Sequence, residues 1–162
     1  MRHFSKSQIQ SRQAALMGGL LCSVLGFAAV PGTAALSVSG SPVSAMKITT
    51  ATPGFPPNSA TDATTTYSVN AKNGVTPLKI VASLSSVMPP GMTLTVALVA
   101  PSLPATSNGA VALDATQRQV VGDITNSISQ TNTITYTLSA TVAAGVVTSQ
   151  SRIVTFTLLS WP

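Results

Sequence analysis

The chain contains no glutamate at all, and its three acidic residues are all aspartates. It has one histidine and one cysteine, His3 and Cys22, and both lie near its beginning. Acid–base catalysis relies most often on His, Glu or Asp, and metal sites rely on clusters of His, Cys and carboxylates. The scarcity of these residues therefore excludes the commonest catalytic and metal-binding arrangements from most of the chain.

The beginning of the chain has the three-part pattern of a secretory signal peptide. Three basic residues and no acid occupy the first thirteen positions, an uncharged stretch of seventeen residues follows at 14–30, and small residues then lead up to and include Ala34 and Ala35. A stretch of this length, interrupted by glycines, is short for a membrane-spanning helix, which needs roughly 20 apolar residues. We therefore predict that residues 1–35 are a signal peptide, cleaved after Ala34 or Ala35, and that the protein is exported to the periplasm, the cell surface or the medium.

Removal of this segment changes the chemistry of the remaining chain, residues 36–162. The only histidine and the only cysteine are lost with it, and five basic residues against three aspartates leave a net charge of +2 instead of +5. Because the five cations are scattered along the chain, we expect no nucleic-acid partner. Without cysteine the exported form contains no disulfide bond, so its stability must come from packing.

Thr, Ser, Val and Ala are abundant after the signal peptide, and apolar residues alternate with polar ones at a period of two. Thr and Val favour strands because their branched Cβ atoms suit a pleated surface. No stretch has the spacing of an amphipathic helix. We predict about seven to nine short strands, in the stretches 36–39, 45–52, 64–71, 78–84, 92–98, 110–113, 117–124, 133–142 and 152–159.

Short strands at near-regular spacing, separated by turns that contain Pro and Gly, are typical of an antiparallel sandwich. We therefore predict an all-β fold with one antiparallel, immunoglobulin-like β-sandwich domain over residues 36–162. In general character the chain is similar to secreted immunoglobulin-like and fimbrial-subunit sandwiches. A small outer-membrane β-barrel is an alternative, but such barrels have aromatic girdles and strands of about 9–11 residues, whereas this chain has few aromatic residues and shorter predicted strands.

The alternation also predicts which side chains form the core. The apolar residues of each strand should point inward and their polar neighbours outward. We expect eleven side chains to be buried: Leu78, Ile80, Leu84, Leu94, Val96, Ile134, Tyr136, Leu138, Val154, Phe156 and Leu158. Three groups of alternating threonines should lie on outer faces: Thr93/Thr95, Thr133/Thr135/Thr137 and Thr155/Thr157. If their strands are neighbours, the hydroxyls would form either an ordered array, as in ice-binding proteins, or an ordinary solvated surface.

Few residues of the exported chain could carry out chemistry. Asp62, Asp114 and Asp123 are its only side-chain carboxylates, and their spacing matches neither a calcium loop nor a carboxylate pair for glycoside hydrolysis. One Ser-x-x-Lys spacing runs from Ser44 to Lys47, but that dyad functions at the start of a helix and Lys47 lies in a predicted strand. We therefore predict no catalytic, cofactor-binding or metal-binding residue, and no cofactor.

Two aromatic residues lie outside the predicted strands. Phe55 belongs to a proline-rich loop, residues 53–58, and Trp161 is the penultimate residue. An aromatic side chain on a loop can stack on a sugar or a peptide, or it can cover the end of a hydrophobic core. We expect Phe55 to cap the core.

Taken with the predicted export, these features favour a non-enzymatic structural or adhesion protein, such as a fimbria-like assembly subunit. The expected partners are a second copy, through edge-strand pairing, or a surface glycan or protein, and the membrane is met only during export. The segment 36–52 has two alternating stretches and is followed by a proline-rich loop, so it should pair either within its own sandwich or with a sheet edge of another subunit. A carbohydrate- or ligand-binding module is the alternative function.

Overall fold

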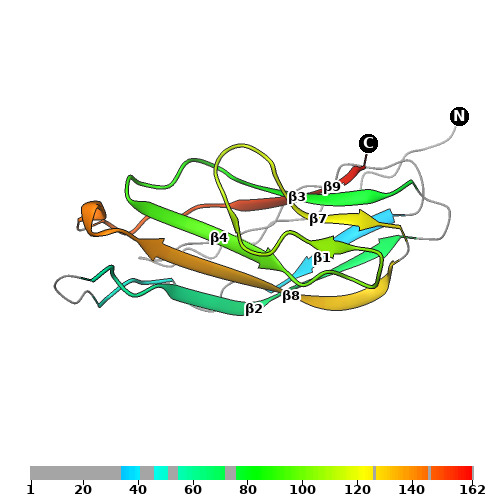
Figure 1. Cartoon of the computed structure of the whole chain (residues 1–162), viewed down its shortest axis with the longest axis horizontal. Coiled ribbons are helices and arrows are strands. Elements are labelled where there is room, and N and C mark those ends of the chain that lie inside the picture. The colour runs from blue at the N-terminus through cyan, green and yellow to red at the C-terminus, as the bar shows by residue number, and fades with distance from the viewer. Residues whose placement is uncertain are drawn as a thin grey trace, which may run out of the picture.

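Two antiparallel sheets form the protein, in a sandwich-like arrangement (Figure 1). The structure is a computed structural model, and it describes residues 34–40, 46–50, 55–71, 76–125, 127–145 and 147–161. Of the predicted signal peptide, only Ala34 and Ala35 lie within these residues. No helix in the described part of the chain is long and apolar enough to cross a lipid bilayer.

The larger sheet has five strands, in the spatial order β1-β2-β8-β4-β6. Its two longest members, β2 and β8, pair antiparallel, with register shifts between Asp62 and Thr65 and between Val69 and Ala71. The strands in that spatial order are β1 (Ala34–Ser39), β2 (Ala60–Ala71), β8 (Ser127–Ala140), β4 (Met92–Leu98) and β6 (Val111–Ala112).

The smaller sheet has four strands, in the order β5-β7-β3-β9. In Figure 1, β3, β7 and β9 are grouped together, and β4, β8 and β2 run side by side in the other sheet. One turn of 3-10 helix, η1 (Val142–Ala144), lies between β8 and β9. The strands are β5 (Thr106–Ser107), β7 (Arg118–Ile124), β3 (Leu78–Leu84) and β9 (Val154–Ser160).

The core lies between the two sheets, and the prediction of its members is confirmed. All eleven side chains expected to point inward are buried. Tyr67, Val69 and Ala71 also share the inner face of β2, as their alternation indicates. The Tyr67 hydroxyl donates a hydrogen bond to the carbonyl oxygen of Val99, and burial raises the pKa of this phenol. An apolar core of this kind is the main source of stability in a domain without disulfides.

Two details of the strand prediction are wrong. Residues 46–50 form no strand, although Met46 and Ile48 pack half-buried against the core. Their alternation therefore reports alternate burial, which does not require a neighbouring strand. Conversely, β5 lies outside the predicted strands, because two paired residues are too few to create a periodicity.

The first predicted strand is present and pairs within its own chain. β1 forms one edge of the larger sheet, where Leu36 lies opposite Val69 and is buried. Of the two partners considered for the segment 36–52, the structure shows pairing within the chain's own sandwich for residues 36–39. Residues 41–45, which include Ser44, lie outside the described part of the chain.

Candidate functional site

The aspartates were the first candidates for chemistry, and the structure uses each of them locally. Asp62 lies on β2, where the register with β8 shifts. Its Oδ1 atom accepts hydrogen bonds from the backbone N–H of Thr64 at 3.0 Å and from the Thr64 hydroxyl at 2.7 Å. Short-range bonds of this kind replace the ladder bonds that a bulge interrupts.

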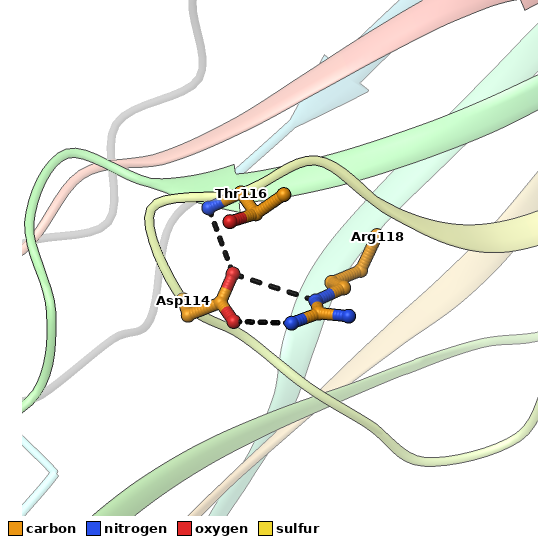
Figure 2. Close-up of polar contacts among 3 residues, drawn as sticks. All are labelled: Asp114, Thr116 and Arg118. Atoms are coloured by element: carbon orange, nitrogen blue, oxygen red, sulfur yellow. Dashed lines mark hydrogen bonds and ion pairs between the residues drawn. The ribbon is translucent and has the colours of Figure 1, made fainter.

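Asp114 lies in the turn between β6 and β7 (Figure 2). Its Oδ1 atom accepts a hydrogen bond from the backbone N–H of Thr116 at 2.7 Å, and its Oδ2 atom lies 2.6 Å from a terminal guanidinium nitrogen of Arg118. The Arg118 hydrogen bond, followed by that of Thr116, lowers the pKa of the Asp114 carboxyl. A carboxylate held ionised by two donors is suited to stabilising a turn and poorly suited to donating a proton.

Asp123 lies on the opposite sheet from Asp62, in β7, and its φ angle of 54° falls in the left-handed region. The pairing of β3 with β7 shifts register here, so that Gly122 and Asp123 together lie opposite Lys79. Asp adopts this conformation more readily than most residues, which explains the residue type at the bulge. Lys47 is exposed in an irregular segment. In the described part of the chain, no three potential metal ligands come together.

Trp161 makes a contact that the alternation of the sequence does not reveal. Its backbone N–H donates to the carbonyl oxygen of Pro77 at 2.6 Å, beyond the end of β9. A Cβ atom at Gly122 would lie only 2.7 Å from Cζ3 of the Trp161 ring, so the ring packs directly over this glycine. The Lys79 ammonium lies 5.7 Å from the ring centroid. In the sequence, the signal for this contact is Gly122, because a glycine inside a strand often marks the close approach of another part of the chain.

The loops at one end of the sandwich expose four large apolar side chains. Strands β2, β4 and β9 begin at this end, and β3 and β8 finish there. Phe55 is 67% exposed, so the prediction that it caps the core is wrong: the loop directs the ring into solvent. Hydrogen bonds between loops hold the segments that carry the other three side chains. Arg152 Nε donates to the carbonyl oxygen of Val87 at 3.2 Å, and the N–H of Thr141 donates to the carbonyl oxygen of Gly91 at 2.8 Å. These three exposed side chains are Val87, Val142 and Ile153.

The outer face of the larger sheet is lined by hydroxyls and is nearly free of charge. Asp62 is the one charged residue in its five strands. Thr61, Thr137 and Thr95 form a row across three neighbouring strands, and the first two hydroxyl oxygens lie 3.5 Å apart. The threonine groups of β4 and β8 therefore lie side by side, whereas that of β9 lies on the other sheet.

Comparison with protein-family models, with curated proteins and with solved structures finds no match. Function must therefore be inferred from the features described above. These are the aspartates, which lie apart from one another, the nearly uncharged hydroxyl face and the apolar loop end.

Proposed function

We propose that this protein is exported and acts through its surface, as a non-enzymatic structural or adhesion module of the fimbria-like assembly type. The observation that carries the proposal is the separation of the aspartates. Asp62 lies at a bulge in β2, Asp114 holds a turn, Asp123 occupies a bulge in β7, and Lys47 is exposed in an irregular segment. Catalysis needs such groups to converge on one substrate atom, whereas assembly needs extended faces and edges.

We further propose that the sandwich is immunoglobulin-like, and the strand order supports this. In a constant-type immunoglobulin domain the first, second, fifth and fourth strands form one sheet, and the third strand pairs in the other sheet with the sixth. Here β1, β2, β8 and β4 follow one another in the larger sheet, and β3 pairs with β9 in the smaller one. The short strands β5 and β6, together with β7, are an insertion into this pattern between β4 and β8.

Microscopy and substitution together test the proposed function. Electron microscopy of the native extracellular fraction, with an antibody against the protein, should show ordered polymers or labelled cell surfaces. Alanine substitution of Asp62, Asp114, Asp123 or Lys47 should leave this labelling unchanged. A hydrolytic activity that any one of these four substitutions abolished would overturn the proposal.

A second candidate, a carbohydrate- or ligand-binding module, is favoured by the exposure of Phe55 among the apolar loops. An exposed aromatic ring can stack on a sugar. In this case Phe55→Ala should abolish signals on a glycan array. Leu103→Ala is the matched control, since Leu103 is exposed in the loop after β4, at the other end of that strand. Absence of any Phe55-dependent signal would remove this candidate.

A further inference from the structure

The last strand, β9, lies at one edge of the smaller sheet. Among the strands that the structure describes, it pairs only with β3, in unbroken register from Leu78 opposite Ser160 to Leu84 opposite Val154. Strands β5 and β6, at two other sheet edges, have only two residues each. β9 is seven residues long, without a charged residue, a proline or a bulge, which are the usual devices that protect an edge.

The hydrogen bonds to β3 show which backbone groups of β9 point outward. The carbonyl of Ile153 accepts from the N–H of Ser85 at 2.9 Å, and the N–H of Trp161 donates to the carbonyl of Pro77 at 2.6 Å. In an antiparallel pair, alternate residues bond to the same neighbour. Odd-numbered residues of this strand therefore bond to β3. The even-numbered ones direct their N–H and C=O groups away from it: Val154, Phe156, Leu158 and Ser160.

We propose that β9 pairs antiparallel with β9 of a second copy of this chain, about a two-fold axis that passes beside Thr157. In this register Val154 lies opposite the partner's Ser160, and Phe156 lies opposite the partner's Leu158. Each of the four outward-directed residues then exchanges two hydrogen bonds with the partner. The same edge serves both subunits, as a two-fold interface requires. This inference rests on the proposed assembly function, and it identifies β9 as the contact between subunits.

The alternative donor, β1 of a second copy, is less favourable. β1 pairs with β2 over its six residues, and Leu36 is buried in the core. Its transfer to another subunit would break this pairing and expose Leu36, unless a third copy replaced it. Pairing between two β9 strands leaves the pairing of β9 with β3 intact in each subunit.

Disulfide trapping tests the register. The two Thr157 residues would form a pair without mutual hydrogen bonds, whose Cα atoms lie about 4.5 Å apart, within disulfide range. In a Cys22→Ser background, Thr157→Cys should form a covalent dimer under mild oxidation. Thr135→Cys, on the outer face of β8 in the other sheet, is the matched control and should stay monomeric. Equal cross-linking of both variants would overturn the proposed register.

Charge complementation tests the pairing without a covalent bond. Thr157→Lys and Thr157→Asp should each weaken the dimer about tenfold in sedimentation equilibrium, because like charges would face each other across the axis. A mixture of the two variants should associate at least as tightly as the wild type. A monomeric wild type at every concentration, or a dimer indifferent to both substitutions, would overturn the pairing. Neither result would affect the surface role, which microscopy tests separately.

Discussion

Thr65 is a polar residue on the buried face of its strand. It lies on the inner face of β2, 1% exposed, and its hydroxyl is the one buried side-chain polar atom without a hydrogen-bond partner in the described part of the chain. The sequence could not reveal this, because threonine suits either face of a strand. The neighbouring bulge leaves Thr65 opposite Ile134, in an apolar environment.

Thr65→Val should stabilise the protein by about 1 kcal/mol, because it removes an unpaired buried hydroxyl while it keeps the shape of the side chain. Urea unfolding followed by circular dichroism measures the change. Thr66→Val, on the outer face, is the control and should stay within about 0.5 kcal/mol of the wild type. A loss of stability in Thr65→Val would mean that the hydroxyl has a partner.

The ion pair of Asp114 and Arg118 gives a pH-dependent prediction. Arg118 lowers the pKa of the Asp114 carboxyl, so this carboxylate adds stability above the ordinary pKa of aspartate. The contribution should disappear as the pH falls through the lowered pKa. Arg118→Gln should raise the Asp114 pKa in an NMR titration. Because both groups are exposed, added salt should reduce the difference between the two proteins. An unchanged Asp114 pKa would contradict the geometry.

The alternation of apolar residues predicts the bounds of a strand well where the strand is paired along its whole length. The predicted stretches 78–84 and 92–98 coincide with β3 and β4. The structure extends β8 back to residue 127 and β2 back to residue 60, where the apolar alternation weakens. Alternation reports the face on which a side chain lies, whereas pairing depends on a neighbour that the local sequence does not specify.

The register of β9 can be tested with two adjacent residues. Phe156 is buried and Thr155 lies on the outer face. Phe156→Ala should cost roughly 3–5 kcal/mol, since it leaves a cavity in the core. Thr155→Ala should stay within about 0.5 kcal/mol. Equal losses in urea unfolding would indicate a register displaced by one residue.

The contact between Gly122 and Trp161 can be tested by overpacking. Gly122→Ala should destabilise the protein by roughly 1–3 kcal/mol, because the added methyl group displaces the ring that packs over it. Trp161 is the only tryptophan, so its fluorescence should also shift to longer wavelength as the ring becomes hydrated. In a Trp161→Ala background the same substitution should cost less. An equal cost in both backgrounds would show that the ring lies elsewhere.

For the whole molecule, the all-β class and the core side chains could be predicted from the sequence, and the order of the strands could not. β8 lies between β2 and β4, although more than forty residues separate it from β2 along the chain. This order decides that the threonines of β4 and β8 share one face and those of β9 another. It also decides that β9 lies at an edge. The surface features that carry the proposed function therefore depend on long-range pairing.

An adhesion or assembly role outside the cell requires export of the protein. Cell fractionation combined with N-terminal sequencing tests it most directly. We expect the protein to be recovered from the envelope or the medium, with Ala35 or Leu36 as its first residue. Recovery of a chain that keeps residues 1–30, in the cytoplasm or anchored in a membrane fraction, would contradict it.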